Sequence, residues 1–559
     1  MTSGIVRRIM SVCLLLLLVS GVAQAQDDTL IVIGWEQEPR TLPPLDAAVF
    51  SRLTQDFYSR NVWDWDQDYN PYPIMVTAIP SIENGLVTTN DEGHTVVTYQ
   101  LKPDLKWSDG EAITADDCLF GHRLYTDRNT GTISRNDYPQ VVESVEKIDE
   151  LTVVQTFNTL YPDFVSDSVY LPCRFPQHVL EPLMEANGGT IDGLPYFTNA
   201  EGVVGYGPYR LESWIKGESI TFVKNPYWDG QEPAIARVIL KMIPDVTQIQ
   251  NALETGEIDL AFNWLENLAA GYAAIPEAAL WSTTSPLQDA LWFNIREGGT
   301  QNPALLDLQV RQAIVHAINR QVITEALLGA GTPIPAAYDL PRWQPDDLTV
   351  LEYDPERANQ LLDEAGWVDS NENGVRDKDG VELVLRVYTT TRKLRQDYQL
   401  AIQQDLSAVG ISTQLFSAPG PQVLFASYPL RGILARGDYD LAIYSAPSDP
   451  ISPNIDPDAY TCGMVPSDAM PDGGNWSGYC DPAFDELVGA IRSNPDPVSR
   501  LEQKHESVRL FTDAVFWAGL FPRLNNYAVN GERFDVESMK TVGTSNTNWF
   551  NHVEYWQPK

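Results

Sequence analysis

Hydrophobic residues in the later half of the chain recur with two different periods. A helical stripe, which Gly329 ends, consists of Val310, Ala313, Ile314, Ala317, Ile318 and Val322. We expect Asp354 to cap a second helix with Pro355 at its first position. The apolar stripe of that helix is Ala358, Leu361, Leu362 and Ala365, and Gly366 follows it. Apolar runs at 383–388, 411–416 and 440–444 predict strands, and residues 392–409 predict a helix.

The earlier half of the chain carries the same two patterns. Strands are predicted at 29–34, 95–101, 152–157, 219–224 and 237–243. Helices are predicted at 115–125, where Thr114 and Asp117 nearly match a capping box, and at 247–253. The alternation of helices and strands indicates an α/β fold.

The first residues have the pattern of an export signal. Arg7 and Arg8 precede an apolar run from Val12 to Val19, and Ala23-Gln24-Ala25 supplies the small residues of a cleavage site. The run is too short to cross a bilayer, for which about 20 residues are usual. We therefore expect residues 1–25 to be removed, leaving 534 residues from 559 and room for two or three domains.

The expected mature chain is strongly acidic. It keeps 36 basic and 76 acidic residues, a net charge of −40. Such a surface repels phosphate backbones, so nucleic acid is not expected as a partner. The acidity indicates either plain solubility or a preference for cationic solutes.

Four cysteines remain after the leader, and an even number in an oxidising compartment favours disulfides. Three pairings exist. We favour Cys462 with Cys480, across a short loop rich in Gly, Pro and Asp, which leaves Cys118 with Cys173. The alternative is four buried thiols.

Motifs of hydrolytic enzymes are missing from the sequence. It has no Gly-x-Ser-x-Gly and no His-Glu-x-x-His, and its six histidines are scattered. Ser213-x-x-Lys216 lacks the Lys-Thr-Gly partner of that enzyme class, so we interpret it as coincidence. The protein is not expected to be an enzyme, and a secreted hydrolase is the rival interpretation from another class.

The segment 369–377 has the spacing of a calcium loop. Its oxygen donors would be Asp369, Asn371, Asn373, Asp377 and the carbonyl of Val375, with Gly374 at the sixth position. Gly380 stands where a bidentate Glu is usual, and Asp379 or Glu382 would have to substitute. The sequence thus predicts either a structural Ca²⁺ site or a polar turn, and no other cofactor is required.

Four landmarks resemble those of family 5 extracellular solute-binding proteins, the dipeptide- and oligopeptide-binding components of ABC importers. They lie in family order over nearly the whole mature chain. They are Trp107-Ser-Asp-Gly-Glu-Ala-Ile-Thr-Ala-Asp-Asp117; Gly205-Tyr-Gly-Pro-Tyr209 with Asn225-Pro-Tyr-Trp228; Trp292-Phe-Asn294 with Val310-Arg-Gln-Ala313 and Ala317-Ile-Asn-Arg320; and Tyr353-Asp-Pro355 through Ala365-Gly-Trp367.

The resemblance implies a periplasmic-binding-protein-like fold (type II, cluster C) with two lobes that close on a ligand. Lobe one would be discontinuous, comprising 26–70, 200–285 and 525–559. An extra domain, 71–199, would sit on lobe one, and 286–524 would form lobe two.

In peptide-binding relatives a carboxylate after the 440–444 strand pairs with the α-ammonium of the ligand, and Asp449 is the candidate here. Asp456 or Asp458 could take this role, or Asp449 could only cap a turn. The loop departs from the family pattern, because it reads Tyr444-Ser-Ala-Pro-Ser where relatives often have an early tryptophan.

Further candidates for ligand contact are mostly aromatic, although plain core packing is the competing interpretation for each aromatic. They are Tyr444, Trp476, Trp264, Tyr58 and, more weakly, Trp63. Arg296 could face a ligand carboxylate or form a surface ion pair.

The resulting hypothesis is an exported, monomeric protein on the outer face of a bacterial membrane. It would capture a peptide or another small solute by lobe closure and deliver it to the transmembrane subunits of an ABC permease. An oligosaccharide is the alternative solute on the same scaffold. Nickel and haem are not favoured, because the histidines do not cluster.

Overall fold

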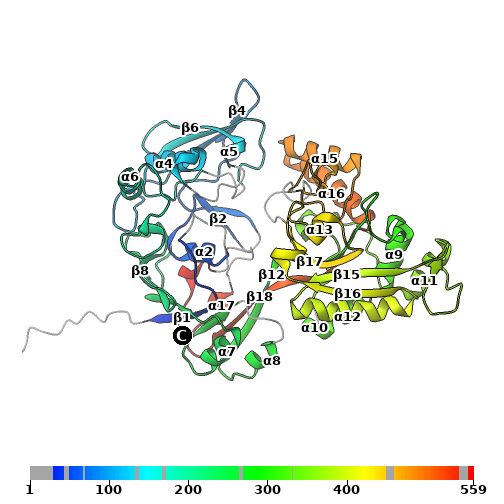
Figure 1. Cartoon of the computed structure of the whole chain (residues 1–559). Helices are drawn as coiled ribbons and strands as arrows, with labels where there is room; N and C mark the ends of the chain where they lie inside the picture. Colours follow the sequence, from blue (N-terminus) through cyan, green and yellow to red (C-terminus); the bar gives the residue numbers. More distant parts are fainter. Residues whose placement is uncertain are drawn as a thin grey trace, which may run out of the picture.

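One ten-stranded sheet runs through both halves of the molecule (Figure 1). The computed structural model describes residues 29–42, 49–66, 69–131, 138–165, 171–262, 268–329, 332–448, 459–471, 473–540, 550 and 552–559. In spatial order the strands are β16 (Ser412–Ala418), β15 (Val384–Thr390), β17 (Leu441–Pro447), β12 (Ala278–Phe293), β18 (Trp517–Asn530), β11 (Leu260–Phe262), β1 (Leu30–Trp35), β10 (Arg237–Met242), β9 (Ser219–Lys224) and β8 (Tyr209–Ile215).

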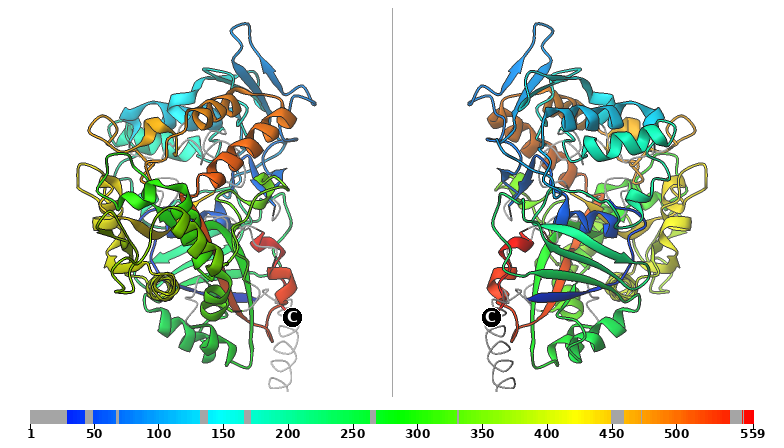
Figure 2. Two further views of the ribbon diagram at one scale, coloured as in Figure 1. Left: turned by 90° about the vertical axis from the view of Figure 1, so that its right-hand side faces the viewer. Right: turned by 90° about the vertical axis from the view of Figure 1, so that its left-hand side faces the viewer.

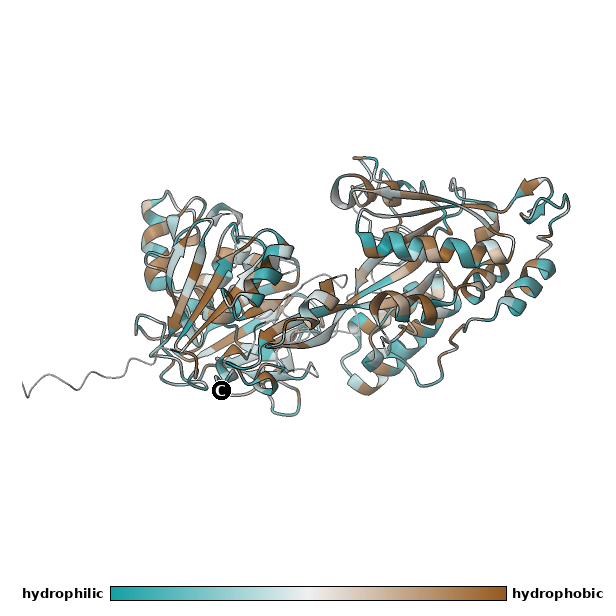
Figure 3. Cartoon of the chain, turned by 90° about the horizontal axis from the view of Figure 1, so that it is seen from below, coloured by the Kyte–Doolittle hydropathy of each residue, from teal (hydrophilic) through white to brown (hydrophobic). Residues whose placement is uncertain are grey.

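Two long strands, β12 and β18, carry the sheet from one lobe into the other. They pair antiparallel from Ala278 opposite Asn530 to Trp292 opposite Trp517, with register shifts between Thr284 and Gln288 and between Asp289 and Ala290. Seen from below, two bodies are joined by this narrow connection (Figure 3). We call the segments 284–288 and 522–524 the hinge.

The two lobes have separate hydrophobic cores. One core draws on residues from Ile31 to Phe262 and from Tyr527 to Trp556, and a smaller cluster around Ile258 and Tyr272 adjoins the same lobe. The other core runs from Ala290 to Phe521. We refer to these bodies as lobe one and lobe two, and their separate cores allow them to move as units.

Lobe two is layered α/β structure around β15, β16 and β17, which run parallel. Helices surround this part of the sheet in Figure 1. They are α9 (Leu308–Ala317), α10 (Arg320–Leu328), α11 (Pro355–Glu364), α12 (Lys393–Ala408), α13 (Ile433–Arg436), α15 (Pro482–Ser493) and α16 (Pro497–Asp513).

Lobe one carries a second, smaller sheet at the top of Figure 1. Its order is β4 (Val87–Thr89), β5 (Thr95–Gln100), β7 (Thr152–Phe157) and β6 (Val142–Lys147), and α4 (Ala115–Thr126) and α6 (Gln177–Ala186) accompany it. Val97 and Val153 of this sheet belong to the same core as Ile31 of β1. This sheet therefore shares the packing of lobe one.

Lobe one also contains α5 (Tyr138–Val141) and several short helices and strands. They are α2 (Val49–Leu53), α3 (Gln55–Tyr58), β2 (Trp63–Trp65), β3 (Pro71–Pro73), α7 (Val246–Glu254), α8 (Ala269–Ala273) and α17 (Val536–Met539).

Local capping signals in the sequence are confirmed. Thr114 and Asp117 form the capping box of α4, and the Asp354 carboxylate accepts a hydrogen bond from the Arg357 N–H at 2.9 Å at the start of α11. The single helical stripe predicted from Val310 to Val322 is wrong, because the structure has two helices, α9 and α10. The Asn319 side chain accepts from the Val322 N–H and begins a new helix, so Val322 points to solvent.

Both expected disulfides are present. Cys118 is bonded to Cys173 and Cys462 to Cys480, the pairing that loop composition favoured. The first lies in lobe one, and the second closes a loop of lobe two that carries Trp476.

Candidate ligand-binding site

Parallel strands of both lobes point their carboxyl ends at the hinge. β17 ends at Pro447 opposite Leu287 of β12, and β15 and β16 run parallel to β17. In lobe one β11 ends at Phe262 opposite Tyr527 of β18, and β1 runs parallel to β11. In open α/β sheets ligands bind beyond the carboxyl ends of parallel strands. The region beside the hinge, which we call the interlobe junction, is therefore the candidate site.

Two predicted residues directly follow strands that end at the junction. Asp449 comes two residues after β17, and Trp264 comes two residues after β11. Both lie outside the described residues, as do Asp456 and Asp458. Their positions in the chain match the candidate site, and their roles stay predictions.

An aromatic cluster lies in lobe two near the end of β17. The Tyr444 ring stacks on Trp292 at 4.9 Å between centroids, and the Trp476 ring stacks on Phe425 at 5.8 Å. Tyr444 and Trp476 are themselves 5.6 Å apart. Tyr444 is only 4% exposed, and burial raises the pKa of its hydroxyl, whereas Phe425 and Trp476 are half-buried. The Phe425–Trp476 pair is thus the part of the cluster with surface to offer a solute.

Arg296 is hydrogen-bonded to the backbone of the segment that carries Trp476. Its guanidinium donates to the carbonyl of Ala435 at 3.2 Å and to that of Trp476 at 3.4 Å. Burial lowers the pKa of this guanidinium. These contacts give Arg296 a role in fixing the Trp476 segment, and its contact with a ligand carboxylate stays a prediction.

A buried polar network ties the hinge to the strand ends of lobe two. Asp289 of β12 is fully buried, and its Oδ1 accepts from the Arg395 Nε at 2.5 Å. Ser445 donates to the other carboxylate oxygen at 2.6 Å, and Arg395 also reaches Thr390 at 3.2 Å. Burial alone would raise the pKa of Asp289, but the adjacent Arg395 and Ser445 hold it below its usual range. The network fixes the ends of β15 and β17 relative to the hinge.

Tyr58 and Trp63 are core residues of lobe one. Tyr58 is 4% exposed and stacks on Phe222, with the backbone of Gly205 and Gly207 packed against it. Trp63 stacks on Tyr99 at 5.7 Å and its indole donates to the Val165 carbonyl. Neither ring has much surface to offer a solute in this structure.

Other residues at the junction escaped the sequence analysis. Glu36 directly follows β1, is half-buried, and has a pKa raised by burial. On the lobe-one side of the hinge, the Trp281 ring stacks on Tyr527 at 4.8 Å. The sequence could have indicated Glu36, because it is a carboxylate two residues after a predicted strand, and ligands of α/β sheets bind beyond the carboxyl ends of the strands.

Comparison with known proteins decides the family. Residues 70–464 match the sequence model of a protein family, the bacterial extracellular solute-binding proteins, family 5 (middle region). The chain belongs to this family. The XP55 protein of Streptomyces lividans is 28% identical over 534 residues, covering 92% of this chain and 88% of that protein. A putative ABC transporter peptide-binding protein of Brucella ovis is 25% identical over 476 residues, covering 84% of each.

Solved structures of the solute-binding fold superpose on nearly the whole chain. NikA of Brucella suis, in complex with Fe(III)-EDTA, matches with a TM-score of 0.75 and 21% identity, covering 95% of this chain and all of that one. AppA of Bacillus subtilis, in complex with a nonapeptide, matches with a TM-score of 0.66 and 19% identity, covering 95% of this chain and 99% of that one. They establish the two-lobed periplasmic-binding-protein fold expected from the resemblance.

Within this solute-binding protein, the predicted calcium loop folds as a polar turn. Asp369 accepts from the backbone of Asn373 and Gly374, and Asn371 accepts from Asn373 as well. The Asp377 carboxylate turns inward and accepts from Ser370 at 2.7 Å. Across the described part of the chain, no three His, Cys, Asp or Glu side chains come together to hold a metal. The calcium prediction at Asp369, Asn371, Asn373, Val375 and Asp377 is therefore not supported.

In the described part of the chain, no helix combines the length and the apolar character needed to cross a membrane.

Proposed function

We propose that this protein is the exported solute-binding component of an ABC importer and that its solute is a peptide. The observation that carries the proposal is the convergence of parallel strand ends from both lobes on one hinge. A solute at that place touches both lobes only when they close, so it favours the closed arrangement. The closed form then docks on the transmembrane subunits of the permease, and the protein acts as a monomer outside the membrane.

Peptide as the solute is supported by relatives and by charge. The Brucella relative is named as a peptide-binding protein, and the AppA structure holds a nonapeptide. Asp449 is the proposed partner of the peptide α-ammonium, with Glu36 on the opposite lobe as a second carboxylate at the junction. Charge-assisted hydrogen bonds of this kind are about twice as strong as neutral ones.

The proposed domain boundaries follow the sequence analysis. After a leader of 1–25, lobe one comprises 26–70, 200–285 and 525–559, the extra domain comprises 71–199, and lobe two comprises 286–524. The separate cores and the hinge at 284–288 support the division between the two lobes, and residues 71–199 share the core of lobe one.

Calorimetric titration of the protein, freed of co-purified solute, tests the proposal. The panel contains peptides of two to nine residues, their N-acetylated forms, maltooligosaccharides and a nickel–histidine chelate. We expect one peptide class to bind at one per protein, N-acetylation to weaken it, and chromatography to recover the peptide intact. Binding of only an oligosaccharide or only the chelate, or cleavage of the peptide, contradicts the proposal.

Three matched variants locate the carboxylate that meets the ammonium group. Asp449→Asn, Asp456→Asn and Asp458→Asn each remove one charge from the same loop. Asp449→Asn should lose the preference for a free amino terminus, whereas the other two keep it. Equal preference in all three variants argues against recognition by this loop.

An oligosaccharide is the second candidate because of the Phe425–Trp476 pair. Its stacked, half-buried rings form a flat apolar surface of the kind that sugar faces contact. The same titration panel separates this candidate from the peptide.

A further inference from the structure

Far from the hinge, an ion pair joins the lobes again. Asp163 follows β7 in lobe one, and Arg500 lies on α16 of lobe two, 337 positions later in the chain. The Arg500 Nη2 donates to the Asp163 Oδ1, and the two residues are only 9% and 6% exposed. In Figure 1 α15 and α16 lie in the upper part of lobe two, on the same side of the molecule as the smaller sheet, while β12 and β18 connect the lobes lower down. The side views in Figure 2 show the same arrangement.

Lobe two holds Arg500 in place for this contact. The Arg500 Nε donates to the carbonyl of Ile491 in the last turn of α15 at 3.0 Å. The Asn494 side chain donates to Ser499 at 3.0 Å and to Gln503 at 2.9 Å, which fixes the turn between α15 and α16. The guanidinium is therefore oriented by its own lobe before it meets Asp163.

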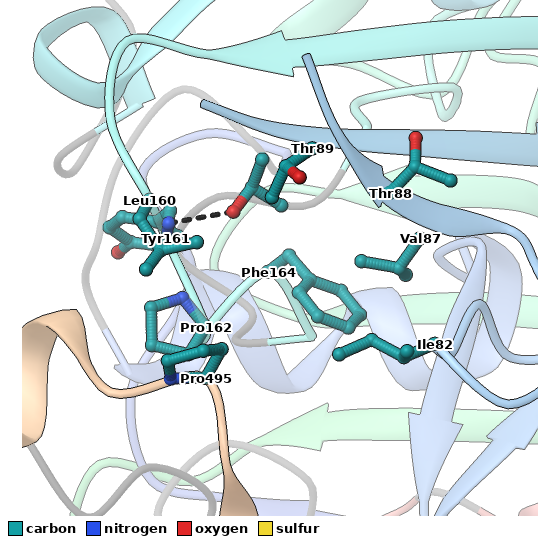
Figure 4. Close-up of a pocket in the computed structure, with 10 residues that line it drawn as sticks. Ile82, Val87, Thr88, Thr89, Leu160, Tyr161, Pro162, Phe164 and Pro495 are labelled. Atoms are coloured by element: carbon teal, nitrogen blue, oxygen red, sulfur yellow. Dashed lines mark hydrogen bonds between the residues drawn. The ribbon is translucent and has the colours of Figure 1, made fainter. Parts of the chain in front are cut away.

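The apolar packing around the pair is loose. A cavity of about 280 Å³ lies between the lobes, lined by the smaller-sheet side of lobe one and by Pro495 of lobe two. Figure 4 shows Pro162 next to Pro495, with the Phe164 ring, Val87 and Ile82 around the cavity. The cavity is partly open to solvent and Pro495 is the only described lining residue from lobe two, so little apolar surface is packed between the lobes here. Among the described residues, the buried ion pair is joined by a longer hydrogen bond between the lobes, from the Arg342 Nη1 to the Tyr69 carbonyl at 3.4 Å.

The same helix carries a second buried ion pair that stays within lobe two. Lys504, one helical turn after Arg500, bonds the Asp339 carboxylate at 2.6 Å, and the two side chains are 1% and 5% exposed. Both ion pairs involve a side chain of α16 and both are buried. Only the Asp163–Arg500 pair joins the two lobes. This makes Lys504–Asp339 a matched control.

We infer that Asp163 and Arg500 form a latch that holds the lobes closed at the end opposite the hinge. When the lobes open, both charges return to water, so the latch releases without leaving a buried charge. Loss of the Asp163 charge leaves the Arg500 guanidinium buried without its counter-charge in the closed arrangement, which penalises that arrangement. The latch rests on the proposed lobe closure but on no particular solute.

Spin labels at two exposed positions, Ile148→Cys in lobe one and Leu430→Cys in lobe two, report the lobe separation. Double electron–electron resonance without solute should show that Asp163→Asn lowers the closed fraction about tenfold or more at low salt. The charge-exchanged double variant, Asp163→Arg with Arg500→Asp, should recover part of it. Lys504→Met should lower the melting temperature and leave the closed fraction unchanged.

Two results overturn the latch. One is an Asp163→Asn distance distribution identical to that of the parent protein at low salt. The other is an equal shift in the Lys504→Met variant, which would make the effect one of general stability. Because solute is absent from the measurement, a wrong peptide assignment does not affect either outcome.

Discussion

The two lobes are joined at one end by backbone and at the other end by side chains. At the hinge, β12 and β18 are paired strands whose register shifts twice, and Asp289 directly after the hinge segment is held by Arg395. At the far end, Asp163 and Arg500 meet beside a loosely packed cavity. Paired strands can bend without separating, whereas one ion pair can form and break. The ion pair at the far end therefore controls the fraction of molecules with closed lobes. The paired strands at the hinge contribute to the stability of the fold.

The largest expected effect is a loss of stability when the buried network beside the hinge is broken. Asp289→Ala removes a carboxylate that is fully buried against Arg395. Breaking such a pair leaves a buried charge and should cost about 3–5 kcal/mol of the free energy of unfolding of lobe two. Urea unfolding measures it. The exposed pair Asp116–Lys147 supplies the control, and Asp116→Asn should leave the midpoint unchanged. Equal midpoints for both variants would show that the hinge network adds nothing.

The disulfides should come next in size. Replacing Cys462 and Cys480 by serine opens a loop of 18 residues and should cost roughly 3 kcal/mol, and the Cys118–Cys173 loop of 55 should cost roughly 4 kcal/mol. The first change should also weaken solute binding, since its loop carries Trp476. Thermal unfolding and titration of the two double variants check both statements. A binding loss in the Cys118–Cys173 variant alone would reverse this assignment.

A moderate effect on solute affinity is expected at the interlobe junction. Trp476→Ala removes one ring of the half-buried stacked pair with Phe425 and should lower solute affinity about tenfold. Phe416→Ala removes one ring of a similar stacked pair, Tyr388–Phe416, on β15 and β16. Calorimetry of both variants decides the point. An equal loss of affinity in the two variants would place Trp476 outside the site.

The smallest effect is the pH dependence of the hinge. Because the pKa of Asp289 is lower in the folded state, its contribution to stability is present above the unfolded value, near 4. The contribution is lost as the pH falls through the folded pKa. Asp289→Asn should therefore differ from the parent protein at pH 7, and the difference should shrink below about pH 4. Urea unfolding at several pH values measures it, and a difference that grows on acidification contradicts the assignment.

Local signals in the sequence predicted much of the fold. Strand patterns located β1, β7, β9 and β15–β17 within a few residues, and caps at Thr114 and Asp354 located two helices. The hinge strands could not be predicted in the same way. The burial of β12 changes from half-exposed residues in lobe one to buried residues in lobe two, so no single period describes it.

The candidate site was harder to predict, because its parts meet only through the fold. Phe425 and Trp476 come from different loops, and their stacking left no mark in the sequence. Asp163 and Arg500 are separated by 337 positions in a chain with 76 acidic residues, where no spacing singles out one carboxylate. Asp449 and Trp264 each lie two residues after a strand that ends at the junction, and their roles stay predictions.

Small-angle X-ray scattering during titration with a binding oligopeptide tests solute capture by closure most directly. The account predicts that the radius of gyration decreases with added peptide and reaches its limit at one peptide per protein. The Asp163→Asn variant should start from a larger radius and need more peptide to reach the same limit. Peptide binding, detected by its heat, with an unchanged radius of gyration would contradict the account.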